Sequence, residues 1–301
     1  MRTASPRSLI DLDHPMLKIR DLAAARAAYQ RLGFTVTPYR TNNPMGGGTT
    51  GGKGGNHLVM LTPQTPNTTN MIELAYCDEA YAWPALRDLL GGPEGLALLV
   101  HSPNDAEQLR SEWVAAGIAC EPVFEVKTDF VDVETGHRDL IHFRVAQPSG
   151  RDWIYPFGGA QILDFRHYLR PEWCQHDNGA LYWSEIALIV PDDAMAAGIE
   201  HLGKVYGFEP AVDADGNVTV QIEKLVLRLL LPANAERMFD GIPLQTADAP
   251  RCHTALTVKV ESMDRLQTLL EERGVTAYSR PDGLYVAPQD VCGVLMRFVE
   301  A

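Results

Sequence analysis

The chain has 301 residues, of which 46% are hydrophobic and 22% charged, and its formal net charge is −13 at pH 7. This length can bury a sizeable core and predicts two domains. The negative charge excludes nucleic acids and anionic membrane surfaces as favoured partners, because phosphate groups are bound by clustered cations. The chain has neither an apolar run of about 18 residues nor the apolar core of a secretion signal near residue 1, so we expect a cytoplasmic protein without a membrane segment.

The cysteines are odd in number, widely spaced and without a CxxC pair. Such a pattern is typical of reduced thiols and excludes a disulfide framework or a zinc knot. They are Cys77, Cys120, Cys174, Cys252 and Cys292.

The first predicted element is a strand over residues 12–19, where apolar residues alternate with His14, Met16 and Lys18. A helix follows over residues 22–32, with Asp21 at the position of an N-cap. Gly33 supplies the permissive backbone that ends the helix, and a second strand begins at Phe34.

This unit recurs three times, starting at Gly95, Trp183 and Cys252. Each copy continues with two more strand-like runs, which in the second copy cover residues 140–145 and 152–157, so the predicted module is βαβββ. One copy cannot cover both faces of its own sheet, and we therefore expect the copies to pair. The predicted fold class is α+β, with four βαβββ modules paired into two tandem domains. The boundaries are a first domain over 1–160 (modules 9–80 and 94–158), a connector over 161–180 and a second domain over 181–301.

Several short motifs resemble the glyoxalase-like domain family of the vicinal oxygen chelate superfamily. They are Asp13-His14, Arg20-Asp21, Leu32-Gly33-Phe34, Asn56, Met71-Ile72-Glu73-Leu74, and, in the connector, Leu169–Trp173 and His176–Ala180. The resemblance implies that two modules form a cup around one divalent metal, bound by the first and last strand of each module. In this superfamily the metal chelates adjacent oxygens of a small substrate and stabilises an enolate or oxyanion.

His14 and Glu73 match the first-strand and last-strand ligand positions of the first module. Parity agrees, because Ile72, Leu74 and Tyr76 form the apolar face of the last strand and leave Glu73 on the other. An imidazole and a carboxylate suit Zn, Fe, Mn or Ni and leave positions open for a substrate. The resemblance also implies that Glu73 is a catalytic residue that moves a proton.

The second module offers weaker ligands, since Ala97 and Tyr155 stand where a histidine and a carboxylate would be expected. A third ligand is then His101 or His142, with His57 a further alternative. The side chains predicted to contact the substrate are Lys18, His57, Trp153 and Tyr155.

The second half departs further from a metal site, because Glu185 and Arg228 occupy the two ligand positions of the third copy. His253 and Arg297 occupy those of the fourth. A cation in place of a ligand carboxylate argues against a metal, so these four residues define a pocket of a degenerate half with a structural or dimer-forming role.

The predicted function is that of a metal-dependent glyoxalase-like lyase or isomerase acting on a small substrate with vicinal oxygens. One alternative is a metal-free binding protein of the bleomycin-resistance type, which sequesters a small aromatic or antibiotic molecule. A second is an extradiol ring-cleaving dioxygenase, which is disfavoured because its ligands would lie in the second half. A homodimer stays open, since such modules pair within or between chains.

Overall fold

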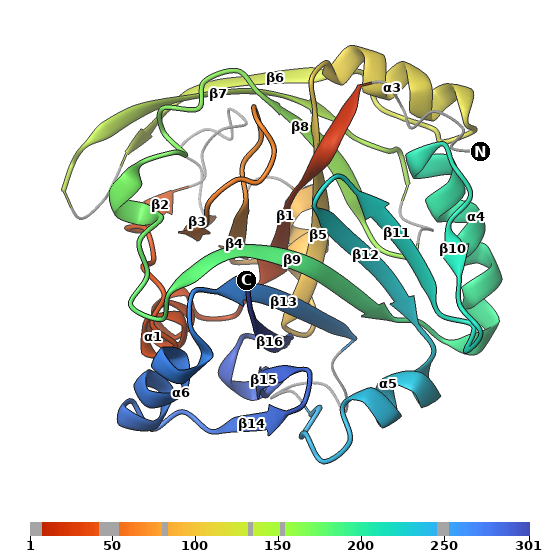
Figure 1. The fold of residues 1–301 in the computed structure, drawn as a ribbon. Coiled ribbons are helices and arrows are strands. Elements are labelled where there is room, and N and C mark those ends of the chain that lie inside the picture. Colours follow the sequence, from red (N-terminus) through yellow and green to blue (C-terminus); the bar gives the residue numbers. More distant parts are fainter. Residues whose placement is uncertain (1–7, 42–53, 80–83, 132–134, 151–153, 246–252) are drawn as a thin grey trace.

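The computed structural model describes residues 8–41, 54–79, 84–131, 135–150, 154–245 and 253–301. The chain forms two mixed sheets of eight strands each, and the longer helices lie on one face of each sheet (Figure 1). Among the described residues, no helix is long and apolar enough to cross a membrane.

The first sheet is built from two modules joined by one short helix. The first module consists of β1 (Leu9–Lys18), α1 (Leu22–Arg31), β2 (Arg40–Thr41), β3 (Gly54–Met60) and β4 (Met71–Cys77). After α2 (Pro84–Leu90), the second module consists of β5 (Gly95–Pro103), α3 (Ala106–Ala115), β6 (Phe124–Val131), β7 (Arg138–Ala146) and β8 (Phe157–Ile162). The strand order is β2-β3-β4-β1-β5-β8-β7-β6, so the antiparallel pair β1–β5 joins the modules at the centre.

The second sheet repeats this plan after a connector that contains the 3₁₀ helix η1 (Pro171–Trp173). The third module consists of β9 (Ala180–Ile189), η2 (Asp192–Ala194), α4 (Met195–Tyr206), β10 (Ala211–Val212), β11 (Val218–Ile222) and β12 (Leu225–Leu230). After α5 (Pro232–Met238), the fourth consists of β13 (Thr254–Val260), α6 (Met263–Glu272), β14 (Ala277–Arg280), β15 (Gly283–Val286), η3 (Pro288–Asp290) and β16 (Leu295–Glu300). The strand order, β10-β11-β12-β9-β13-β16-β15-β14, matches that of the first sheet, so the prediction of four paired βαβββ modules is confirmed.

Local signals place the helices as predicted. Asp21 caps α1, since its Oδ1 accepts hydrogen bonds from Ala23 N at 2.9 Å and Ala24 N at 3.0 Å. Gly33 ends the helical segment with a φ of +89°, and a Cβ there would lie 2.8 Å from Asn178 Cβ. Only glycine therefore lets the end of α1 contact the connector so closely.

The faces of the two sheets that carry the longer helices share one core. Trp113 of α3 donates from Nε1 to Val205 O of α4 at 3.1 Å, and Phe34 stacks on Phe298 with ring centroids 6.1 Å apart. Fully buried leucines from both halves join the same cluster, for example Leu109 and Leu202. Because this core is common to both halves, each sheet turns its other face away from the partner sheet.

One predicted strand is placed wrongly. The sequence pattern predicts a strand over residues 152–157, whereas residues 154–156 lie outside any strand and β8 begins at Phe157. The aromatic residues at 155 and 157 are buried among side chains of α4 and the shared core, so tertiary packing gives the alternating pattern here.

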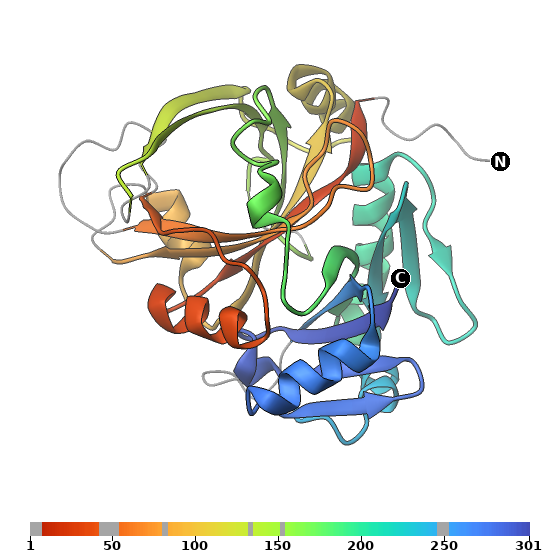
Figure 2. The same ribbon diagram turned by 60° about the vertical axis from the view of Figure 1, so that its left-hand side comes forward.

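The connector lies inside the curve of the first sheet, as Figure 2 shows. Tyr168 and Trp173 belong to a cluster with Leu58 and Met60 of β3, Met71 of β4 and Ile141 of β7. The connector thereby joins the two arms of the curved sheet through apolar contacts on its concave side.

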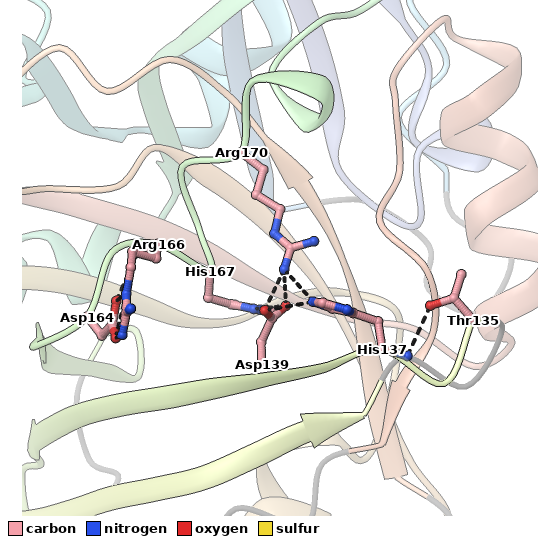
Figure 3. A network of polar contacts seen from close by, with 7 residues as sticks. All are labelled: Thr135, His137, Asp139, Asp164, Arg166, His167 and Arg170. Atoms are coloured by element: carbon pink, nitrogen blue, oxygen red, sulfur yellow. Dashed lines mark hydrogen bonds and ion pairs between the residues drawn. The ribbon is translucent and has the colours of Figure 1, made fainter.

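Asp139 of β7 anchors the connector (Figure 3). It accepts hydrogen bonds from His167 Nδ1 at 2.9 Å and from Arg170 Nη2 at 2.5 Å. Burial alone would raise the pKa of Asp139, but the hydrogen bond from His167 and the charges of His167 and Arg170 outweigh it and lower the pKa. The Arg170 guanidinium also lies 4.6 Å from the Trp173 ring centroid.

Two arginines of the connector provide a matched test of this anchor. Arg170→Gln should lower the free energy of unfolding by about 1–2 kcal/mol, because it removes a charged hydrogen bond from a carboxylate that is 19% exposed. Arg166→Gln should leave it nearly unchanged, since Arg166 is 87% exposed and pairs with neighbouring Asp164. Urea unfolding of both full-length variants measures the difference, and equal effects would contradict the anchor.

Candidate functional site

A β-bulge on the central strand places two neighbouring side chains together. The register of β1 against β5 shifts between Leu12, opposite His101, and His14, opposite Val100. Such a shift lets consecutive residues point to the same side of a strand. Asp13 and His14 do so here, with His14 Nδ1 at 2.6 Å from Asp13 Oδ1.

His14 reaches across to the last strand of the module. Its Nε2 lies 3.2 Å from Glu73 Oε2, with both side chains less than one-tenth exposed. The other Glu73 oxygen, Oε1, accepts a hydrogen bond from Asn56 Nδ2 of β3 at 2.6 Å. The predicted convergence of His14 and Glu73 is therefore what the structure shows, and it extends into a chain of four polar side chains.

The carboxylate of Asp13 is fully satisfied although it is buried. Thr69 donates to Oδ1, and Ser102 donates to Oδ2 at 2.9 Å. Burial alone would raise the pKa of Asp13, but its hydrogen bond with His14 and those from Thr69 and Ser102 lower it below the ordinary value. Burial would likewise lower the pKa of His14, yet the hydrogen bonds to Asp13 and Glu73 raise it to about 9.

One polar atom of the site has no partner. Asn56 Oδ1 is buried, and none of the described residues donates a hydrogen bond to it. A buried acceptor left unpaired costs about 1–3 kcal/mol, so a ligand atom or water at this position would be stabilising.

Apolar side chains lie on both sides of these polar groups. One cluster is the contact of Tyr168 and Trp173 with β3, β4 and β7 described above. The other joins Ala75 and Ala97 to Leu90 of α2, with Met16 packed against them. The polar chain thus forms a layer between two apolar clusters, where electrostatic interactions are stronger than in water.

Two side-chain atoms of this site, His14 Nε2 and Glu73 Oε2, are suitable donors to one divalent metal ion. Ligand atoms about 2.1 Å from an ion and roughly 100° apart would be separated by about 3.2 Å, which is the distance between His14 Nε2 and Glu73 Oε2. Asp13 holds Nδ1 and so directs Nε2 outward, as carboxylates do for metal-binding histidines. Within the described part of the chain, however, no group of three His, Cys, Asp or Glu side chains is placed to bind an ion.

His101 is not a ligand, which corrects that prediction. It lies in the interface between α3 and α4, where Nδ1 donates to Gly158 O at 2.9 Å and Nε2 accepts from the Tyr206 hydroxyl at 2.8 Å. Both ring nitrogens are therefore engaged. Tyr155 lies in the same interface, with its ring centroid 5.0 Å from that of His201, so it does not line a cup with His14.

His142 also lies outside the site. It alternates with Ile141 and Phe143, which pack toward the connector, so His142 points to the opposite face of β7. Its Nε2 contacts Glu125 Oε1 at 2.7 Å. The prediction of His142 as a third ligand is corrected accordingly.

The remaining predicted substrate contacts are dispersed. His57 shares the face of Leu74, its partner on β4, and donates from Nδ1 to Thr37 O at 2.7 Å. Lys18, at the end of β1, donates to Gly91 O at 3.1 Å. Trp153 lies outside the described residues.

In the second sheet, Glu185 is held between two guanidinium groups. Arg228 Nε donates to its Oε2 at 3.1 Å, and Arg297 Nη2 lies 3.4 Å from its Oε1. Burial would lower the pKa of Arg297, but the charge of Glu185 and the neighbouring groups raise it. His253 is exposed and directly precedes β13. Its backbone oxygen accepts a hydrogen bond from Ile189 N, and its side chain does not join this network.

Comparison with known proteins agrees with the fold. A family model described as a glyoxalase-like domain matches residues 12–203. The chain belongs to the glyoxalase-like domain family. No curated protein matches the sequence.

Solved structures show the same fold at very low identity. A hypothetical protein from Staphylococcus aureus matches with a TM-score of 0.60 and 10% identity, covering 96% of this chain and 98% of that one. A mutant 4-hydroxymandelate synthase from Streptomyces coelicolor matches with a TM-score of 0.53 and 12% identity, covering 97% of this chain and 93% of that one. The Mn(II)-bound glyoxalase from Novosphingobium aromaticivorans matches with a TM-score of 0.53 and 12% identity, covering 98% of this chain and 83% of that one.

Two residues of the site are absent from the sequence-based candidates, although both belong to family-like motifs. Asp13 precedes His14, and strict alternation would put it on the other face. The sequence does not specify how the strand of Asn56 pairs with the strand of Glu73. In the structure Leu58 lies opposite Glu73, and Asn56 lies opposite Ala75. The motifs themselves could have identified both residues, since Asp13 belongs to an Asp-His pair and Asn56 belongs to the family-like motifs of the sequence.

The buried histidines predict acid sensitivity. Burial lowers the pKa of His101, His176 and His201 to about 4, below the unfolded value of about 6.5. Between these values the unfolded chain binds more protons, so stability falls as the pH falls. Burial raises the pKa of Asp11 to about 6, which offsets one of these protons.

The expected net loss is about 2 kcal/mol per pH unit between pH 6 and 5, since each unbalanced proton contributes about 1.4 kcal/mol per unit. Urea unfolding at pH 6.5, 5.5 and 4.5 measures it. A stability that is flat over this range would contradict the prediction that these imidazoles are neutral.

Proposed function

We propose that the protein is a metal-dependent glyoxalase-like enzyme of the lyase or isomerase type, which acts on a small substrate carrying adjacent oxygens. The observation that carries the proposal is the pair His14 Nε2 and Glu73 Oε2, 3.2 Å apart and backed by Asp13. A bound divalent metal would supply a Lewis acid that polarises a substrate carbonyl. The fold alone does not select this chemistry, because one fold supports many activities.

The residues of the chain would act around that ion. Asp13 accepts a hydrogen bond from His14 Nδ1 and thereby keeps His14 Nε2 directed at Glu73. Glu73 would take a proton from the substrate carbon next to the carbonyl and return it to the neighbouring carbon. The apolar clusters on both sides exclude water, which strengthens the electrostatic interactions of these groups.

The alternative function is a metal-free binding protein for a small molecule. It is favoured by the ligand set, because the described His, Cys, Asp and Glu side chains give only two donors beside one another here. The ring of Tyr155, which this alternative would use, lies in the interface between the halves. Its aromatic contacts would instead come from Tyr168 and Trp173 of the connector.

Metal analysis of protein purified without a tag or chelator distinguishes these functions. We expect about one equivalent of divalent metal in the wild type and its loss in His14→Ala, because two protein donors become one. His142→Ala is the matched control and should retain the metal, since His142 faces the other side of β7 and contacts Glu125.

A wild type without metal, with a small aromatic ligand still bound, would favour the binding protein. Equal loss of metal in both variants would also contradict the proposal, because it would show that the metal is not held at His14.

A further inference from the structure

We propose that Asn56 is the third protein donor of this site, and that its amide oxygen binds the same divalent cation as His14 and Glu73. The inference rests on the proposed metal-dependent function and adds a ligand that is neither histidine nor carboxylate. It also narrows the kind of ion.

The orientation of the Asn56 amide follows from its partner. A carboxylate oxygen only accepts hydrogen bonds, so the group 2.6 Å from Glu73 Oε1 must be the amide NH₂. The amide oxygen therefore points away from that carboxylate oxygen and is not interchangeable with the nitrogen.

The amide group of Asn56 is connected to the other two donors through Glu73. The O and N atoms of an amide are about 2.2 Å apart, so Oδ1 lies within about 5 Å of Glu73 Oε1. Glu73 Oε2 is in turn 3.2 Å from His14 Nε2. The three side chains come from β3, β4 and β1, which are consecutive in the sheet.

The absence of a donor at Oδ1 points to a ligand. Asn56 is 6% exposed, and no described residue hydrogen-bonds to this oxygen. Other buried amides of the chain are paired on both sides: Asn178, for example, donates to Leu32 O and accepts from Ala180 N. A cation is a partner that an amide oxygen and a carboxylate can share, because both are ligands of hard ions.

The resulting donor set has one nitrogen and two oxygens and contains no sulfur. Such a set suits Mn²⁺ or Fe²⁺ and lacks the thiolates that favour zinc in many sites. With three protein donors, an octahedral ion keeps positions for two adjacent substrate oxygens. Asn56 would thus have two functions, since Nδ2 fixes Glu73 and Oδ1 contacts the metal.

The test measures Mn²⁺ binding by electron paramagnetic resonance of the free ion, using metal-free full-length protein. Asn56→Leu removes both functions and should weaken Mn²⁺ binding by at least about 10-fold. It should also raise the number of water molecules on the ion by one, measured from the relaxation of solvent protons. Asn234→Leu, at a buried asparagine of the second half, is the control and should leave the Mn²⁺ affinity unchanged.

Asn56→Asp separates a ligand from a residue that only positions Glu73. It keeps an oxygen donor and adds charge, but it loses the N–H that Glu73 accepts. A direct ligand predicts affinity equal to or higher than that of the wild type, whereas a positioning role predicts a loss like that of Asn56→Leu.

The outcomes separate the two proposals. A wild type that binds no Mn²⁺ overturns this inference, and the proposed function falls with it if the metal analysis also finds no other divalent metal. A wild type that binds Mn²⁺ with unchanged affinity in Asn56→Leu overturns the inference alone, as does a parallel loss in Asn56→Asp. Circular dichroism of each variant establishes that the chain is folded.

Discussion

The site depends on one interaction, in which the imidazole of His14 lies between the carboxylates of Asp13 and Glu73. Buried charges are stable only when each is paired and hydrogen-bonded. Here Thr69 and Ser102 satisfy Asp13, and Asn56 satisfies one oxygen of Glu73. Removing any one partner would leave a buried charge incompletely paired in apolar surroundings. The network therefore constrains the positions of four strands, and the fold holds it through the pairing of β1 with both β4 and β5.

The second half keeps the geometry of this arrangement and changes its chemistry. Glu73 pairs with the residue two places after His14, and Arg228 pairs with Ala187, two places after Glu185. Both central strands also carry a register shift next to this residue. Equivalent positions thus hold an acid and a histidine in one sheet, and an acid and an arginine in the other. A guanidinium cannot be deprotonated to bind a metal, so the duplicated position neutralises Glu185.

The sequence predicts those features of the protein that are determined by contacts between residues close together in the chain. Alternation and helix caps are local, so the modules and the facing of His14 and Glu73 follow from short stretches. His101 was misassigned because its partner, Tyr206, is 105 residues away, across the interface between the halves. Tyr155 was misassigned because β8 begins at residue 157. The role of Asn56 needed the register of β3 on β4, which no local pattern specifies.

The connector adds a constraint that paired modules alone do not have. A concave sheet of this kind would be open along its length, but the connector lies inside its curve. Tyr168 and Trp173 of the connector pack with side chains of β3, β4 and β7, and Leu90 of α2 packs on Ala75 and Ala97. The polar layer between them leaves the side chains of His14 and Glu73 only 8% and 9% exposed. A molecule that reaches both groups must therefore be small, or the connector must move. Because Asp139 fixes the connector through His167 and Arg170, the position of the connector over the site depends on an ion pair on β7 and not on the strands that carry the site.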